Sequence, residues 1–349
     1  MIAPRGEHDE VGRNLVLDEK TRVLSALVGG RIDRAPVTAV ISSVTQEMMT
    51  ECRAPWPDGH CDPELMARLG AAAHTMYGLE SVKVPFDVVV EAEALGAEVN
   101  HGDLNIYPQV VTPVCYDPAD LKIPDDFFKR GRVPVVLEAI RLLRHRYGAE
   151  TVIVSSAMGP LSACGLMFGM STFMIWMLTE PDKYHRAMEA GTELATMYAR
   201  AQIEAGSDLI QFGEAAASGS MISPKQYAQN VAPYHRKLVS GVGGLTALHI
   251  CGNIGGHLEA IASTGATAIS LDERVDMAVA RQVLKGRMAI IGNVPTERLS
   301  RGTPDEIRAL SRQALVDGVD LLNAGCSLPT DTPGVNLEAM VEEGRSGLQ

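Results

Sequence analysis

Two residues with metal-binding side chains end an apolar run of the sequence, where packing alone would favour hydrophobic residues. In LTALHIC (245–251), His249 and Cys251 are two positions apart, so on a β-strand they point to the same side. Another such residue, Cys326, ends the run VDLLNAGC (319–326). One imidazole and two thiolates form a zinc ligand set that leaves a fourth position open, as in catalytic zinc sites. The alternative is that the cysteines pack in the core and that His249 is a buried histidine with satisfied hydrogen bonds.

Carboxylates end two further apolar runs. Asp272 is predicted to occupy the fourth metal position until a substrate displaces it, and it is a candidate catalytic residue. Glu273 follows directly and is the other candidate, although adjacent strand residues point to opposite faces. Glu214 is interpreted either as a catalytic group that orients His249 or takes the substrate's proton, or as a helix-cap or loop carboxylate. Asn293 is a further candidate at the end of a run.

The remaining cysteines and histidines are assigned other roles. With no export signal visible, the six cysteines are expected to be reduced thiols or metal ligands. Cys115 and Cys164 have apolar neighbours and are predicted to pack in the core. His257 falls in the first turn of a predicted helix and is expected at the surface. A second metal site would have an incomplete ligand set, so we do not predict one from Cys52, His60 and Cys61.

Eight short β-rich runs alternate with helical stretches from residue 35 onward. Each run is nearly continuously apolar, which is typical of parallel strands buried on both faces. The alternation therefore predicts a (β/α)₈ barrel, and no glycine-rich phosphate fingerprint favours an open dinucleotide-binding sheet. In such barrels the chemistry lies at the carboxyl ends of the strands, where the residues above are found. The predicted strands are 35–41, 80–86, 151–157, 208–214, 245–251, 266–272, 288–294 and 319–326.

An insertion follows the second predicted strand. Residues 97–114 alternate polar and apolar side chains around Gly102, which predicts a β-hairpin over one end of the barrel. No linker or internal repeat is visible, so residues 18–349 are predicted to form one domain after a loose tail at 1–17.

Composition excludes several classes of protein. The formal net charge is −12 and no basic cluster is visible, which argues against binding to nucleic acid. No apolar run approaches 18 residues, so no membrane span is predicted. The charged N-terminal stretch lacks an apolar leader core. We therefore expect a soluble cytoplasmic enzyme, either a monomer or a homodimer.

The runs LHICGN and LLNAGC resemble the His-x-Cys…Cys zinc motif of the corrinoid-protein:coenzyme M methyltransferases, a family of the uroporphyrinogen decarboxylase superfamily. The resemblance extends to APWPDGH with PELM (54–66), RGRVPVVLEAIRLLR (130–144), AGSDLIQFGE (205–214) and the ISP at 222–224. It therefore covers residues 18 to 343 or so.

The resemblance implies a (β/α)₈ barrel with zinc bound by His249, Cys251 and Cys326 at its mouth. The family's displaceable fourth ligand is a glutamate just after the sixth strand, and the matching position here is Asp272. The implied reaction moves a methyl group from a methylated corrinoid (a methylcobamide) to a thiol such as coenzyme M. The thiol displaces Asp272, attacks the methyl carbon on cobalt(III) and leaves cobalt(I). Since no D-x-H-x-x-G pattern for cobalt ligation is present, the corrinoid is expected on a separate protein.

Three other functions remain open. Tetrahydrofolate or another acceptor could replace the thiol. A uroporphyrinogen decarboxylase would need an arginine-rich segment after the first strand, and residues 40–51 contain no arginine. A non-catalytic subunit that binds zinc or corrinoid would retain the metal without methyl transfer.

Overall fold

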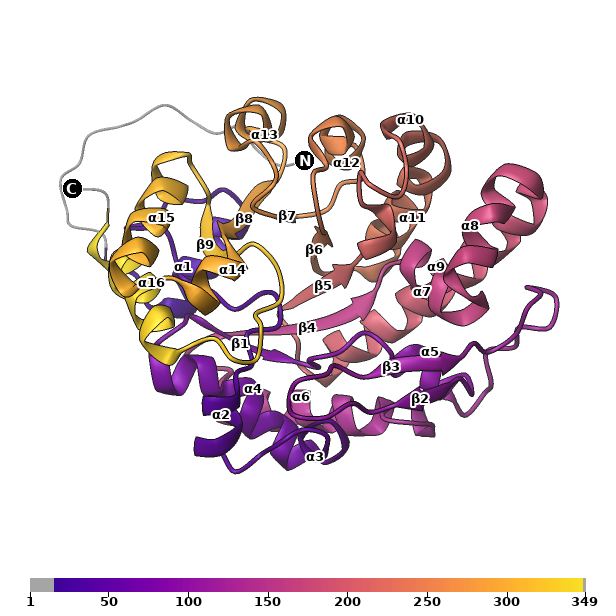
Figure 1. The fold of residues 1–349 in the computed structure, drawn as a ribbon, viewed down its shortest axis with the longest axis horizontal. Coiled ribbons are helices and arrows are strands. Elements are labelled where there is room, and N and C mark those ends of the chain that lie inside the picture. The colour runs from indigo at the N-terminus through magenta and orange to yellow at the C-terminus, as the bar shows by residue number, and fades with distance from the viewer. Residues whose placement is uncertain (1–15, 348–349) are drawn as a thin grey trace.

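A curled parallel sheet surrounded by helices forms the core of the computed structural model, which describes residues 16–347 (Figure 1). The sheet has seven strands in the order β1-β4-β5-β6-β7-β8-β9, and every neighbouring pair is parallel. This arrangement confirms the predicted α/β barrel class. The strands are β1 (Ser81–Val84), β4 (Val152–Met158), β5 (Leu209–Gly213), β6 (Leu245–Ile250), β7 (Ala268–Leu271), β8 (Ala289–Val294) and β9 (Leu321–Ala324).

The first predicted strand, 35–41, differs from the prediction because it forms a single bridge and not a regular strand. Val37 bridges to Leu322 of β9, and its carbonyl accepts a hydrogen bond from the Glu80 amide, just before β1. Thr38 N–H donates to the Leu322 carbonyl, and the next two amides are bound by side chains: Ala39 N–H donates to Ser81 Oγ, and Val40 N–H donates to Asn323 Oδ1. The segment thus fills the gap between β9 and β1 and completes the ring without a regular ladder.

Helices connect the strands and cover the outside of the ring. The predicted capping box of Thr303 and Glu306 is present at the start of α15. The helices are α1 (Glu19–Leu27), α2 (Gln46–Glu51), α3 (Asp58–Cys61), α4 (Pro63–Tyr77), α5 (Val90–Ala94), α6 (Val133–Tyr147), α7 (Pro160–Phe168), α8 (Met170–Thr179), α9 (Pro181–Ala205), α10 (Pro224–Gln226), α11 (Ala232–Val242), α12 (Leu258–Ala262), α13 (Met277–Leu284), α14 (Thr296–Arg301), α15 (Pro304–Val316) and α16 (Gly334–Ser346).

The lower half of the barrel interior is an apolar core that α1 closes. Val23, Ala26 and Leu27 of α1 belong to the same buried cluster as the inward-facing residues near the strand starts. Farther along the strands, inward positions change to polar and metal-binding residues. The strand members of this cluster include Val152, Val154, Leu209, Ala247, Ala268, Ala289 and Leu321.

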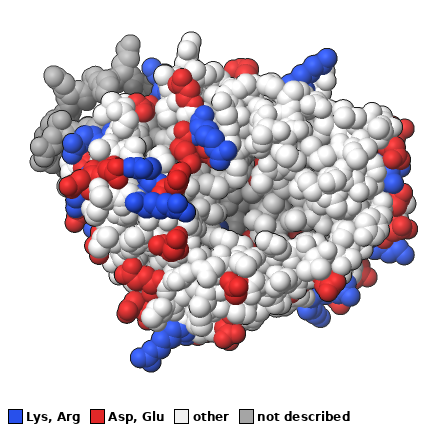
Figure 2. Space-filling view, viewed as in Figure 1, with Lys and Arg blue, Asp and Glu red and all other residues white. Residues whose placement is uncertain are grey.

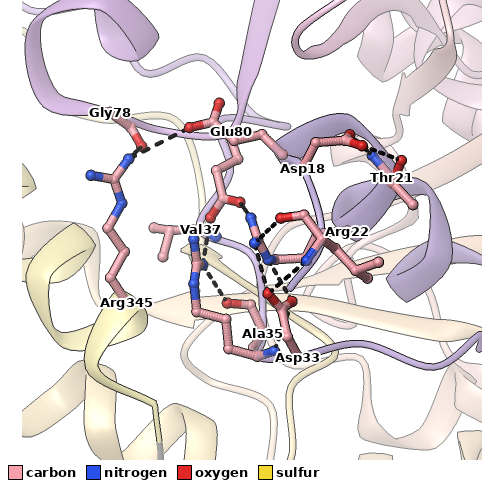
Figure 3. Close-up of polar contacts among 12 residues, drawn as sticks. Asp18, Thr21, Arg22, Asp33, Ala35, Val37, Gly78, Glu80 and Arg345 are labelled. Atoms are coloured by element: carbon pink, nitrogen blue, oxygen red, sulfur yellow. Dashed lines mark hydrogen bonds and ion pairs between the residues drawn. The ribbon is translucent and has the colours of Figure 1, made fainter. Parts of the chain in front are cut away.

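An ion network fastens α1 to the lower rim of the barrel (Figure 3). The Arg22 guanidinium lies 2.7 Å from Asp33 Oδ1 and 2.5 Å from Glu80 Oε2. Arg34 contacts the other Glu80 oxygen at 2.6 Å, and the Val37 amide donates to that same oxygen. Because Glu80 is fully buried, its charge depends on these two arginines.

The predicted hairpin insertion is confirmed as two antiparallel strands, β2 (Glu98–Asn100) and β3 (Gln109–Thr112). Its connecting segment reaches the loops at the carboxyl ends of the strands, because Tyr107 Oη donates to the Leu328 carbonyl at 3.2 Å. The hairpin therefore lies over the mouth of the barrel, the end that carries the candidate site.

Within residues 16–347, no single helix has both the length and the apolar character needed to cross a membrane. Only α7 and α8 taken together satisfy that test, and the pair is bent by 113°. Most of the predicted tail at 1–17 lies outside the described residues.

Candidate metal centre at the barrel mouth

The structure brings His249, Cys251 and Cys326 together, although Cys326 is 75 residues from Cys251 in the chain. His249 lies on β6 and Cys251 directly after it, while Cys326 follows β9. His249 Nε2 lies 3.3 Å from Cys251 Sγ and 3.5 Å from Cys326 Sγ, and the two sulfurs are 3.6 Å apart.

These three separations fit a zinc ligand set. Tetrahedral zinc with bonds of about 2.0 Å to nitrogen and about 2.3 Å to sulfur separates its ligand atoms by roughly 3.5–3.8 Å. Within the described chain, no other group of three such residues gathers its ligand atoms as closely. The donor chemistry and the spacing both suit a metal cation.

The surroundings hold the three ligand atoms in place. Ser270 Oγ, fully buried on β7, lies 3.2 Å from His249 Nδ1, so Nε2 is left facing the sulfurs. The hydrogen bond between the sulfurs, followed by contact with His249, lowers the pKa of Cys326 to about 4. The same hydrogen bond raises the pKa of Cys251 above its usual value. Two sulfurs that share one proton in this way are both freed as thiolates when a cation binds.

The Asp272 carboxylate, predicted as the fourth ligand, lies outside the group of ligand atoms that the structure gathers. Its Oδ2 accepts the Gly252 amide at 2.7 Å, and its Oδ1 accepts the amide and the guanidinium of Arg274, each at 3.0 Å. Both oxygens are therefore used to fix the turn after Cys251. Asp272 thus supports the loop after Cys251, and neither of its carboxylate oxygens is without a hydrogen bond.

Glu273, the other candidate for the fourth position, lies near Cys326. Its Oε2 is buried without a hydrogen-bond partner among residues 16–347 and lies against Gly325, the residue before Cys326. Burial raises the pKa of Glu273, and the nearby charges of Asp272 and Cys326 add to that effect. A cation near Cys326 would compensate this buried carboxylate oxygen, which has no partner among residues 16–347.

Glu214 occupies the helix-cap position that was the alternative interpretation. Its Oε1 accepts the Leu161 amide at 3.0 Å and Oε2 accepts the Ser162 amide at 2.9 Å, at the start of α7. His235 Nε2 lies 2.9 Å from Oε1. The Glu214 carboxylate thus caps the start of α7 and does not orient the His249 ring, whose Nδ1 contacts Ser270.

The remaining candidate residues lie outside the His249, Cys251 and Cys326 cluster. Asn293 makes one long contact, from Nδ2 to the Asp272 carbonyl at 3.5 Å, and supports the same loop. The prediction that His257 lies at the surface is wrong, because its ring is buried against Tyr227 with the centroids 5.1 Å apart. His60 is buried 3.1 Å from Asp87 and does not form a metal cluster with Cys52 and Cys61 in the described chain.

A cavity of about 150 Å³ leads from the three ligand residues into the barrel. Figure 2 shows a hollow near the middle of the face that it draws, with a broad area beside the hollow that carries few charged side chains. The inner part of the cavity is lined by Lys83 of β1, Ser156 of β4 and Gln211 of β5. Sequence reasoning missed Lys83, although a lysine inside a strand that is buried on both faces is itself an unusual signal.

Together, the fold and the site define an α/β barrel with a His-Cys-Cys cluster at its mouth. The family model described as uroporphyrinogen decarboxylase (URO-D) matches residues 18–346. The methylcobamide:CoM methyltransferase MtaA of Methanosarcina barkeri is 35% identical over 92% of this chain and 96% of its own length. The corresponding MtbA of Methanosarcina acetivorans is 36% identical over 93% and 96%.

A solved structure titled "methyltransferase from Methanosarcina mazei" superposes with a TM-score of 0.92 at 35% identity, covering 95% of this chain and 99% of that one. The chain therefore belongs to the URO-D family and, within it, to the group of methyltransferases that these relatives represent.

Proposed function

We propose that this enzyme transfers a methyl group from a methylated corrinoid to the sulfur of coenzyme M, with zinc held by His249, Cys251 and Cys326. The observation that carries the proposal is the set of ligand-atom separations of 3.3, 3.5 and 3.6 Å at the mouth of the barrel. The names of the M. barkeri and M. acetivorans relatives support the donor and the acceptor.

The bound zinc would supply a cation that favours the thiolate form of the acceptor. A free alkyl thiol is mostly protonated at neutral pH, with a pKa of about 8.5. In the transfer, the acceptor thiol would release its proton to solvent at the mouth, its sulfur would bond to the methyl carbon, and the cobalt–carbon bond would break. Both electrons of that bond stay on cobalt, which goes from cobalt(III) to cobalt(I). The residues of this chain would hold the acceptor in the cavity, with its sulfur at the end lined by His249, Cys251 and Cys326.

The size of the cavity indicates how the methyl donor approaches. A volume of about 150 Å³ has room for a small thiol but not for a corrinoid ring. The donor must therefore meet the acceptor from outside, carried by a separate protein that docks on the mouth. Exposed apolar residues on the mouth-side loops suit such docking: Val88 after β1, Leu104 and Ile106 in the hairpin, and Met221 after β5.

The test uses the purified protein with free methylcobalamin and coenzyme M under anaerobic conditions. We expect the methylcobalamin absorbance to fall and the cobalt(I) spectrum to appear in step with methylated thiol. Removing the metal with a chelator should stop the reaction, and added zinc should restore it. Transfer at the same rate in metal-free protein would overturn the metal assignment.

Parallel assays with the substrates of the alternative functions distinguish them from the proposed one. Methylation of tetrahydrofolate with no thiol product would identify a different acceptor. Consumption of a porphyrinogen with release of carbon dioxide would identify a decarboxylase. Bound zinc without transfer to any acceptor, even with the corrinoid carrier supplied, would identify a non-catalytic subunit. Each of these results contradicts the proposal.

We expect Glu273, rather than Asp272, to occupy the fourth metal position. Cobalt(II) accepts the same ligands as zinc and reports its coordination in the visible spectrum. In cobalt-substituted protein, Glu273→Gln should change that spectrum because the ligand oxygen becomes an amide. The matched variant Asp272→Asn should change the spectrum less, since it keeps one acceptor for Gly252 or Arg274 and removes no ligand expected here. The reverse pattern would restore Asp272 as the ligand.

A further inference from the structure

A buried lysine faces the inner part of the cavity. Lys83 is 6% exposed, and it is the only Lys or Arg among the described residues that line this cavity. Its neighbours Val82 and Val84 belong to the core between sheet and helices, whereas Lys83 points to the inside of the barrel. Burying an ammonium group is costly unless something compensates its charge.

The contacts of Lys83 do not include a carboxylate. Nζ donates to the Pro85 carbonyl at 2.9 Å and to Ser156 Oγ at 3.0 Å, and no acidic oxygen of residues 16–347 forms an ion pair with it. Asp87 also lines this cavity, but Arg132 binds both its oxygens, at 2.7 and 3.1 Å. The ammonium therefore has two neutral acceptors and one N–H left over.

Gln211 provides a second group without a partner at the same place. It is 5% exposed, it lines the cavity, and its side-chain amide makes no hydrogen bond within the described part of the chain. Gln211 pairs in register with Ser156, which holds Lys83. Burial lowers the pKa of Lys83 to about 7, and an anion beside it would favour its charged form.

These groups lie one step below the metal-binding residues. His249 is in register with Gly213, and Gln211 precedes Gly213 by two residues on the same strand. Two residues of strand correspond to about 6–7 Å. A thiol and an anionic group joined by two carbons would span this gap, with the sulfur at the upper end.

We propose that Lys83, Ser156 and Gln211 bind the anionic end of the acceptor, so that the cavity selects short thiols carrying a sulfonate or carboxylate. This assignment rests on the proposed function for the thiol end. The anionic end stands on its own contacts and is tested by a ligand without sulfhydryl chemistry.

The test compares wild type with Lys83→Met, which removes the charge and keeps a long apolar side chain. Ethanesulfonate, which has the anion but no thiol, should bind wild type by calorimetry and bind Lys83→Met about 10–100-fold more weakly. In methyl transfer, Lys83→Met should raise the KM for coenzyme M, a mercaptoethanesulfonate, by a similar factor. The KM for mercaptoethanol, which has no anion, should stay near the wild-type value.

Lys225→Met is the charge control, because Lys225 is exposed on α10 at the mouth side. It should leave all three ligands unaffected. Equal binding of ethanesulfonate by wild type and Lys83→Met overturns the proposal, and so does an equal rise of both KM values. Gln211→Leu provides a second variant if Lys83→Met does not fold, and it should weaken ethanesulfonate in the same direction. Absence of methyl transfer with intact ethanesulfonate binding would count against the proposed function alone.

Discussion

Replacing Cys326 with serine is expected to release the bound zinc and to reduce methyl transfer by more than about 100-fold. Changes in residues that only support metal ligands cost about 10–100-fold, and loss of a ligand should cost more. A serine hydroxyl at this position is a poor zinc ligand, because zinc sites of this kind use thiolate sulfur and not a hydroxyl oxygen. Elemental analysis and the rate of cobalt(I) formation measure the two losses. His249→Ala should behave in the same way.

Cys115→Ser is the matched control. Cys115 is half-buried, lies outside the cluster and donates its S–H to the Asp117 carbonyl at 3.4 Å, a contact that serine can keep. Metal content and rate should both remain close to wild type. A Cys326→Ser protein that retained both zinc and activity would show that the cluster is a packing arrangement.

Replacing Arg22 with methionine is expected to lower the free energy of unfolding by about 3–5 kcal/mol, because it removes one partner from a buried ion network. Arg22 holds Asp33 and Glu80 at once, and Glu80 has no exposure to water. Arg34 would remain beside Glu80, but Asp33 would lose its guanidinium. Urea unfolding followed by circular dichroism measures the change.

Arg287→Met is the control for this prediction, since its ion pair with Glu259 is on the surface and should contribute little. The network also predicts a dependence on pH. The hydrogen bonds from Arg22 hold the pKa of Asp33 well below its usual value of about 3.9. The stability that this pair contributes is thus present above the unfolded-state pKa of about 3.9, and it is lost as the pH falls toward the folded-state pKa. Equal unfolding free energies for Arg22→Met and Arg287→Met would contradict the assigned role.

Periodicity was sufficient for the barrel because seven predicted runs become paired strands with ends shifted by a few residues. The first run could not be judged in this way. Its β-rich composition fits a strand, but Ser81 and Asn323 take its amide hydrogens, and those residues are far away in sequence. Side chains that replace a ladder are visible only once the ring is closed.

The site was predictable where residue type alone restricts the chemistry. The His-x-Cys pair and Cys326 stand out because few structural roles need them at a strand end. The direction in which a carboxylate points could not be predicted, because it depends on backbone amides that are distant in sequence. Glu214 accepts from an amide at the start of α7, and Asp272 accepts from Gly252. His257 was misplaced because it ends a short turn before α12, where its ring packs against Tyr227.

The closure of the lower barrel by α1 has a kinetic consequence. With Val23, Ala26 and Leu27 packed into that end, a small molecule enters and leaves the cavity by the mouth. Under the proposed function, a corrinoid carrier seated on the mouth would block that route. The proposed reaction would then follow a compulsory order: the acceptor binds before the carrier, and the methylated product leaves after it. Initial-rate measurements with the carrier in excess would show inhibition by the carrier that competes with the acceptor.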